Sequence, residues 1–245
     1  MEWAIFADVH GNLDALEAVL ADARAAGAGR YACLGDIVGY GAEPDACCER
    51  VRALGCAAVV RGNHDHACSH RTSLAWFNPR AAEAARWTRE HLSEENRAWL
   101  RTLPYRAVAA GAALVHGSLF EPPHWDYVVD TASARRHFER QRTETAFVGH
   151  SHVPCLFALR AGRVLGFRPP ATPLVLDPGA GKYLVNVGSV GQPRDGDPHA
   201  CYCLYDPEAH AVEWRRVEYD AEAAARKIRA AGLPDVLAAR LLIGR

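Results

Sequence analysis

Residues 3–10 read Trp-Ala-Ile-Phe-Ala-Asp-Val-His, a short apolar run that passes directly into Asp8 and His10. An apolar run of this length is typical of a strand that is buried on both faces. Two further runs, at residues 31–34 and 57–60, pass into Gly35-Asp36 and Gly62-Asn63-His64-Asp65. Each predicted strand therefore ends where carboxylate, amide or imidazole side chains begin.

Helices are predicted between these strands. Residues 12–26 carry Leu13, Leu16 and Leu20 at helical spacing, and the glycines that follow end this helix. A second helix is expected over residues 43–54, beginning at Glu43-Pro44. The strand–helix–strand–helix–strand order predicts a parallel sheet.

The rest of the chain is predicted to be mixed in structure. Helices are expected over residues 79–102, 131–141 and 220–241, the last with a break near Gly232-Leu233-Pro234. Strands are expected at residues 105–109, 112–116, 145–148, 155–160, 163–167, 182–187, 200–205 and 211–217. Because no linker or low-complexity tract divides the two halves, we expect residues 1–245 to form a single α/β domain.

The composition is typical of a globular protein, with 49% hydrophobic and 23% charged residues among 245. The 28 lysines and arginines balance 29 aspartates and glutamates, which argues against bulk nucleic-acid binding and against a polybasic membrane surface. No apolar run is long enough to predict a membrane span. The N-terminus lacks the basic start and long apolar stretch of a signal peptide, so the expected compartment is the cytoplasm.

Polar residues gather at the predicted strand ends. They are Asp8, His10, Asp36, Asn63, His64, Asp65, His116, His150 and His152. Ligand sites of α/β sheets form beyond the carboxyl ends of the strands, so these side chains are expected to meet. Aspartate, asparagine and histidine suit divalent Mn, Fe, Ni, Co or Zn. In an extended segment alternate residues share a face, so Asp8 with His10, and His150 with His152, can reach one site.

Each of these pieces has an ordinary interpretation when taken alone. An Asp-x-His triplet is more often a loop or helix cap, a single histidine is more often a core or surface group, and Gly-Asn-His-Asp can be a turn. Five such pieces in order, each after a strand-like run, favour a metal site.

The ordered motifs Asp-x-His, Gly-Asp, Gly-Asn-His-Asp, a histidine after a strand and Gly-His-x-His span residues 8–152. In this pattern the chain resembles the calcineurin-like metallophosphoesterases. Its tail, with Asn186-Val187-Gly188-Ser189-Val190, is similar to small bacterial phosphodiesterases and proteins labelled diadenosine tetraphosphatases. The resemblance implies a four-layer α/β/β/α sandwich of two mixed sheets, with residues 1–150 supplying the first sheet and later strands completing the second.

The resemblance also implies a role for each motif residue. One metal ion would be held by Asp8, His10 and His152, and a second by Asn63, His116 and His150, with Asp36 bridging both. His64 would not bind metal but would face the substrate, as an acid to the leaving oxygen or a donor to the phosphoryl group. Asp65 would orient His64. Gly39 stands where many relatives have an acid or an asparagine, which is expected to alter the pocket wall.

These roles predict a dinuclear metal-dependent phosphohydrolase, most simply a phosphodiesterase acting on small nucleotides or other phosphodiesters. Two divalent ions about 3.5–4 Å apart would activate a bridging hydroxide for in-line attack. One alternative is a phosphomonoesterase, although no pair of arginines accompanies Asp36. Another is a catalytically silent protein-binding scaffold. The presence of all seven ligand residues and of His64 argues against this alternative. A small-molecule phosphoester is the expected partner, and a homodimer stays open because such dimers are common.

Two residues outside the motifs are further candidates for substrate contact. Arg194 lies in a glycine-rich turn from which a guanidinium could reach a phosphate, the ordinary alternative being a surface salt bridge. Tyr40 could stack on a base or bind a phosphate oxygen, the alternative being a tyrosine packed within its loop. His124 and Trp125, in a proline-rich loop near His116, are candidates for a substrate rim.

Overall fold

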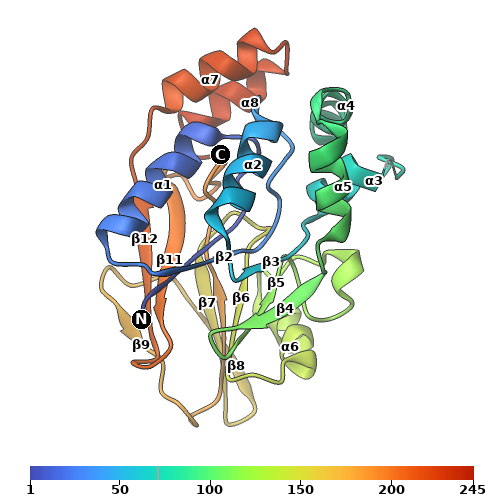
Figure 1. The fold of residues 1–245 in the computed structure, drawn as a ribbon. Helices are drawn as coiled ribbons and strands as arrows, with labels where there is room; N and C mark the ends of the chain where they lie inside the picture. Colours follow the sequence, from blue (N-terminus) through green and yellow to red (C-terminus); the bar gives the residue numbers. More distant parts are fainter. Residues whose placement is uncertain (71) are drawn as a thin grey trace.

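The strands form two six-stranded sheets in a computed structural model that describes residues 1–70 and 72–245. The first half of the chain supplies β1 (Trp3–Phe6), α1 (Leu13–Ala25), β2 (Arg30–Cys33), α2 (Pro44–Leu54), β3 (Ala58–Val59), α3 (Asn63–His70), α4 (Pro79–His91), α5 (Glu94–Thr102), β4 (Arg106–Ala109) and β5 (Ala112–Val115). The second half supplies η1 (Pro122–His124), α6 (Thr131–Arg140), β6 (Thr145–Val148), β7 (Cys155–Arg160), β8 (Arg163–Phe167), β9 (Leu174–Val175), β10 (Lys182–Asn186), β11 (Ala200–Asp206), β12 (Ala211–Val217), α7 (Ala221–Ala230) and α8 (Asp235–Leu241) (Figure 1).

Both sheets are mixed. The first has the order β3-β2-β1-β11-β12-β9, in which β1, β2 and β3 run parallel and β11 joins β1 antiparallel. The second has the order β4-β5-β6-β10-β7-β8, in which β5, β6 and β10 run parallel. The expectation that residues 1–150 supply one whole sheet is wrong. Each sheet instead combines strands from both halves of the chain: β11, β12 and β9 extend the first sheet, and β10, β7 and β8 extend the second.

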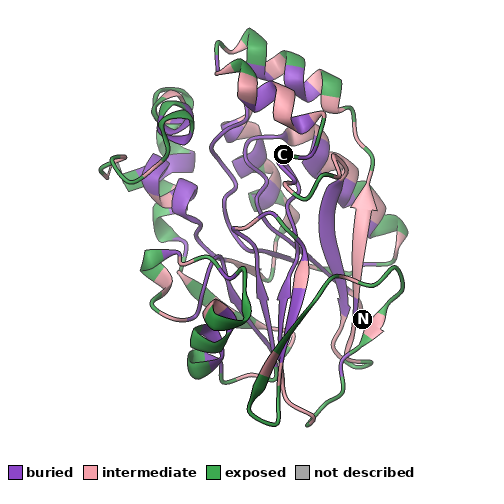
Figure 2. Cartoon of the chain, turned by 180° about the vertical axis from the view of Figure 1, so that it is seen from behind, coloured by how far each residue is buried: buried purple, intermediate pink, exposed green. Residues whose placement is uncertain are grey.

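The two sheets pack face to face because their strands are apolar on both sides. In β1, Trp3 and Ile5 belong to the core between the sheets, whereas Ala4 and Phe6 pack in the core that includes α1 and α2. In β6, Phe147 faces the first sheet and its two neighbours face the core that includes α6. Figure 2 shows that the central strands are buried and that α6 is exposed on its outer side. The predicted four-layer sandwich of two mixed sheets is confirmed.

Three elements were not expected from the sequence. The Gly-Asn-His-Asp segment leads into the helix α3, whose polar side chains lack the apolar spacing of a typical surface helix. The short strand β9 and the 3-10 turn η1 carry too few residues to show a period. The region 79–102 forms two helices, because Ser93 caps the second by accepting a hydrogen bond from the Asn96 amide.

Among residues 1–70 and 72–245, no helix combines the length and the apolar character that crossing a membrane requires.

Candidate metal centre

The predicted site residues meet at one end of the sandwich, beyond the carboxyl ends of parallel strands from both sheets. Asp8 and His10 follow β1, and Asp36 follows β2 of the first sheet, while His116 follows β5 and His150 follows β6 of the second. The Nε2 atom of His116 lies 3.2 Å from the Asp36 carboxylate, which joins the two sheets directly. The carboxyl ends of the parallel strands therefore converge on one place, as expected for an α/β sheet.

The backbone is strained where it turns the side chains inward. Five of the seven predicted ligands are non-glycine residues in the left-handed region: Asp8 (φ 56°), His10 (51°), Asp36 (52°), His150 (65°) and His152 (59°). Such a conformation costs on the order of 1–3 kcal/mol per residue and persists only where the surrounding structure enforces it. The fold thus fixes this arrangement in advance of any ligand.

One group of side chains contains Asp8, His10 and His152. Their ligand atoms lie within 4.8 Å of one another. The Nε2 atoms of the two histidines are 3.2 Å apart, and Asp8 Oδ1 lies 3.3 Å from the His152 nitrogen. Oδ1 is buried and has no hydrogen-bond partner in the described part of the chain. A buried carboxylate oxygen without a partner is costly unless a cation occupies the space that it faces.

A second group contains Asp36, His116 and His150, again with ligand atoms within 4.8 Å. The Nε2 atom of His116 lies 3.1 Å from His150 Nδ1 and 3.2 Å from the side-chain oxygen of Asn63. Asp36 Oδ2 also lies 3.7 Å from His10 Nε2 in the first group. Asp36 therefore stands between the two groups, in the position that a bridging carboxylate requires.

Backbone carbonyls orient three of the imidazole rings. The Nδ1 atoms of His10, His116 and His152 lie 3.1, 2.9 and 2.6 Å from the carbonyl oxygens of Val38, Leu34 and Gln192. An Nδ1–H that donates to a carbonyl leaves Nε2 as the free nitrogen lone pair, which is the usual arrangement of metal-binding histidines. The ring of His150 instead turns Nδ1 inward and stacks on Tyr127 at 3.9 Å.

The electrostatics of the cluster also suit a cation. Burial raises the pKa of Asp8 to about 7 and lowers the pKa of His10, His150 and His152 well below the ordinary value. Burial also lowers the pKa of His116, but the charge and hydrogen bond of Asp36, the charge of Asp8 and the Leu34 carbonyl together outweigh burial and raise that pKa to about 9. Neutral imidazoles are the form that binds metal, and the proton on His116 would be released on binding. The donor set and the unpartnered Asp8 oxygen therefore fit divalent metal ions.

His64 lies at the edge of this cluster. Its backbone amide donates to Asp36 Oδ1 at 2.8 Å, and its ring lies 5.0 Å from the ring of His10. A nitrogen of the ring also falls within 4.8 Å of ligand atoms of His10 and Asp36. Its Nδ1 is buried and has no hydrogen-bond partner in the region described, and burial lowers its pKa to about 4. The ring is therefore neutral at pH 7 and has one N–H to donate.

Asp65 does not orient His64, contrary to the expectation. Its carboxylate accepts hydrogen bonds from the backbone amides of Asp36, Ile37, Val38 and Gly62, at 2.8–3.2 Å. Both residues lie in the first turn of α3, and successive residues of a helix do not face each other. Asp65 instead holds the loop that carries Asp36, so its effect on the site passes through the backbone.

Gly39 leaves room for the ring of His64. A Cβ at this position would overlap Nδ1 of His64, and the backbone of Gly39 is left-handed (φ 90°). A residue with a side chain cannot occupy this place without displacing the ring. The glycine three residues after Asp36, where many relatives have an acid or an asparagine, is thus what gives the ring of His64 its space.

Gly149 allows β6 to approach Asp8 closely. A Cβ at this position would lie 2.5 Å from Ala7 Cβ and 2.6 Å from Asp8 Oδ2. Overpacking of this kind typically costs about 1–3 kcal/mol, so we expect Gly149→Ala to lower the melting temperature by several degrees and to weaken metal binding. Gly29→Ala is the control, since its Cβ would meet only the flexible Met1 side chain. Equal melting temperatures for the two variants would contradict the close approach.

The candidate substrate residues Arg194 and Tyr40 lie beside the cluster. The Tyr40 ring is buried between His10 and His64, with ring centroids 4.7 and 4.5 Å away. The Arg194 guanidinium lies 5.6 Å from the centre of the Tyr40 ring, and its Nη2 donates to Gln192 Oε1 at 2.8 Å. Burial, and after it the charge of Arg194, lowers the pKa of His152. Arg194 is thus within electrostatic reach of the cluster.

Sequence reasoning missed several residues of the site. Arg240 of α8 shares the Gln192 oxygen with Arg194 at 3.3 Å, and Tyr127 supports His150. Trp76 and Phe77 line a cavity above His64. None of these residues follows a predicted strand or belongs to a motif, so no signal in the sequence distinguishes them from ordinary surface or core residues.

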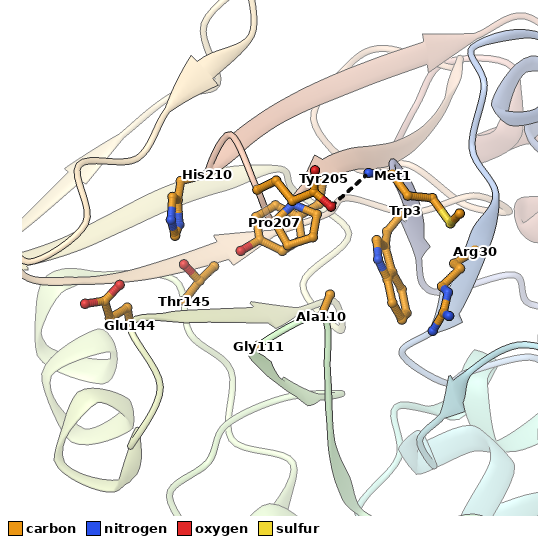
Figure 3. Close-up of a pocket in the computed structure, with 11 residues that line it drawn as sticks. Met1, Trp3, Arg30, Ala110, Gly111, Glu144, Thr145, Tyr205, Pro207 and His210 are labelled. Atoms are coloured by element: carbon orange, nitrogen blue, oxygen red, sulfur yellow. Dashed lines mark ion pairs between the residues drawn. The ribbon is translucent and has the colours of Figure 1, made fainter.

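A larger cavity, of about 710 Å³, lies at the opposite edge of the sandwich (Figure 3). Its lining includes Trp3, Arg30 and Thr145, at the amino ends of β1, β2 and β6, and the N-terminal amine pairs with Glu208 across 3.8 Å. None of the three metal-ligand groups in the described residues lies there. The candidate metal-binding residues therefore lie at the end of the sandwich where the parallel strands have their carboxyl ends.

Comparison with known proteins places this site in a family. The model of the calcineurin-like phosphoesterase superfamily domain matches residues 1–210. An uncharacterized protein of Methanocaldococcus jannaschii is 39% identical over 99% of this chain and 98% of its own length. The crystal structure of a metallophosphoesterase from Sphaerobacter thermophilus is 41% identical, with a TM-score of 0.87 over 100% of this chain and 99% of that one. A hypothetical protein from Pyrococcus horikoshii shares the fold at 23% identity, with a TM-score of 0.81 over 100% of this chain and 98% of that one.

The family model spans every residue of the cluster, and the relatives from Methanocaldococcus jannaschii and Sphaerobacter thermophilus match over 99–100% of the chain. The chain therefore belongs to the calcineurin-like phosphoesterase superfamily and is a metal-dependent phosphoesterase with a buried His/Asp metal site.

Proposed function

We propose that the protein is a dinuclear metal-dependent phosphodiesterase acting on small nucleotides or other small phosphodiesters. The observation that carries this proposal is the place of Asp36, whose carboxylate lies 3.2 Å from His116 and 3.7 Å from His10 and so joins two ligand groups. Asp8, His10 and His152 would hold one cation, and Asn63, His116 and His150 the other. The native metals would come from Mn, Fe, Ni, Co and Zn.

The protein's own groups would position the phosphoester. The chemistry supplied by two bound divalent cations is activation of a water nucleophile and neutralisation of charge on the phosphoryl oxygens. The neutral ring of His64 would donate its N–H to the phosphoryl group or to the leaving oxygen. Arg194 would attract the anionic substrate, and Tyr40 would hold the rings of His10 and His64 in place.

The positions of the arginines support a diester rather than a monoester. A monoester carries more negative charge, and a phosphatase would be expected to place a pair of arginines near Asp36 and the Asn63 turn. Arg61 precedes this turn, but its guanidinium donates to the carbonyl oxygen of Arg101 at 2.5 Å and lies over the ring of Tyr105 at 5.0 Å. Arg61 is therefore engaged elsewhere, and the arginines beside the cluster, Arg194 and Arg240, share the side-chain oxygen of Gln192, whose carbonyl contacts His152.

Further features fit the same proposal. A catalytically silent scaffold is disfavoured, because all seven ligand positions are filled and five of them are held in left-handed backbone conformations. Strands from both halves of the chain complete each sheet, which supports one domain over residues 1–245. Three predictions stay untested. They are that the protein is cytoplasmic, that it can form a homodimer, and that it has no membrane or bulk nucleic-acid partner.

The test compares an aryl phosphodiester with the matching monoester on chelator-stripped protein, before and after Mn²⁺ is restored. We expect turnover only with the metal and a higher kcat/KM for the diester. The melting temperature should rise with the metal as well, because a ligand that binds only the folded state stabilises it by about 2.7 kcal/mol at 100 times its Kd. A higher kcat/KM for the monoester would identify a phosphatase, and binding without turnover of either would favour the scaffold.

A further inference from the structure

A cavity of about 330 Å³ opens directly above the metal centre. Asn63, His64 and His150 of the site form part of its lining, so a group attached to a phosphate at the metal centre would extend into it. The rest of the lining is unusually aromatic, with Tyr40, Trp76, Phe77, Trp125 and Tyr127. Polar Asn78, His124 and Asp126 also line the cavity, and aromatic walls combined with polar groups are typical of a site for a small organic ligand.

Two tryptophans of this lining face each other as parallel plates. The rings of Trp76 and Trp125 are inclined by only 9°, with centroids 6.0 Å apart. Nearly parallel rings with centroids this far apart form an offset stack, a common arrangement of aromatic pairs. The Trp76 side chain is 56% exposed, so part of its ring is available to a further planar ring.

Trp125 is the fixed member of the pair. Its side chain is only 7% exposed, and the rings of His66 and Tyr105 pack against it at 5.1 and 5.8 Å. Its backbone is left-handed (φ 50°), a strained conformation for a bulky residue that is often found at ligand sites. Packing from behind thus holds this ring in the wall of the cavity.

The indole N–H of Trp125 also lacks an acceptor. Nε1 is buried and has no hydrogen-bond partner within residues 1–70 and 72–245. A buried donor without a partner costs free energy that a ligand with a suitable acceptor would recover. Nucleobases offer both features that this wall requires, because they are planar rings with acceptor nitrogens or oxygens at their edges.

We propose that Trp76 and Trp125 form a nucleobase subsite beside the metal centre, so that the substrate is a nucleotide phosphoester whose base stacks on these rings. This inference rests on the proposed phosphoesterase function and narrows it. The base would stack on the exposed indole of Trp76, with an acceptor at its edge directed toward Trp125 Nε1. Its phosphate would then lie over His64 and the metal ligands.

The test measures binding rather than turnover, by isothermal titration of the Mn²⁺-loaded protein with AMP and with ribose 5-phosphate. The two ligands carry the same phosphate and sugar, and only AMP carries a base. Stacking on an aromatic side chain predicts that AMP binds on the order of tenfold or more tightly than ribose 5-phosphate. Equal affinity of the two ligands would overturn the base subsite, even if the aryl phosphodiester is hydrolysed.

Variants identify the rings responsible. Trp76→Ala should weaken AMP binding by about tenfold and leave ribose 5-phosphate unchanged, and Trp76→Phe should restore most of the AMP affinity. Trp125→Phe keeps a ring but removes the N–H, so AMP should bind a few-fold more weakly. Phe167→Ala is the matched control, because Phe167 is 49% exposed and lies in β8, outside the cavity lining. If Trp76→Ala weakens both ligands equally, the ring is structural and the proposal is wrong.

Discussion

Asp36→Asn is expected to abolish turnover while the protein stays folded. The Asp36 carboxylate lies between the two ligand groups, and asparagine has the same shape but lacks the negative charge that two cations would share. Loss of an outer partner of a metal ligand already costs about 10–100-fold in affinity or activity. Loss of the shared ligand should therefore lower kcat/KM by at least about 10³-fold, or ~4 kcal/mol in transition-state stabilisation.

The accompanying measurement is the metal content of the purified variant by mass spectrometry. We expect it to fall below the content of the unaltered protein, because the bridging position affects both cations. Asp235→Asn is the control, since Asp235 of α8 forms an exposed ion pair with Arg229 of α7. If Asp36→Asn keeps full activity, the proposed role of Asp36 as the ligand shared by both cations is wrong.

His64→Ala should have the opposite signature, with both metals retained and most turnover lost. The ring of His64 lies in the cavity lining and presents one N–H, and loss of one positioned hydrogen-bond donor typically costs about 10²–10³-fold in kcat. The loss should be smaller for a substrate with an activated aryl leaving group, which needs less help from a donor. Metal content and kcat are measured together, with exposed His91→Ala as the control.

The structure makes this experiment decisive for the role of His64. The ring lies close enough to His10 and Asp36 to be considered with them as a third ligand group. If His64→Ala loses a metal ion, His64 is a ligand and the assignment of a substrate-facing donor is wrong. If the metals stay and the rate is unchanged, the buried ring serves only to pack against Gly39 and Tyr40.

Much of this architecture could be predicted because the sequence carries it locally. The runs at Trp3–Phe6 and Thr145–Val148 are short, apolar and followed by polar residues, and parallel strands bring such ends together. The distribution of strands between the sheets could not be predicted. It depends on whether β10 joins β6 and β11 joins β1, and all these strands are apolar enough to fit either sheet.

The site shows the same division between local and long-range information. Asp8 and His10 are recognisable because they are two residues apart after a strand. The role of Asp65 depends on α3, which lacks a clear apolar period, so the sequence does not indicate that its carboxylate binds backbone amides of the Asp36 loop. Trp76 and Trp125 come from loops far apart in the chain, and only the folded structure places their rings 6.0 Å apart.

The most direct test of the central claim is a crystal structure of the Mn²⁺-loaded protein with anomalous scattering. We predict two peaks about 3.5–4 Å apart, one among Asp8, His10 and His152 and one among Asn63, His116 and His150, with the Asp36 carboxylate between them. His64 should lie outside both coordination shells. A single peak, or a peak bound by His64 in place of one of these seven residues, would contradict the dinuclear centre described above.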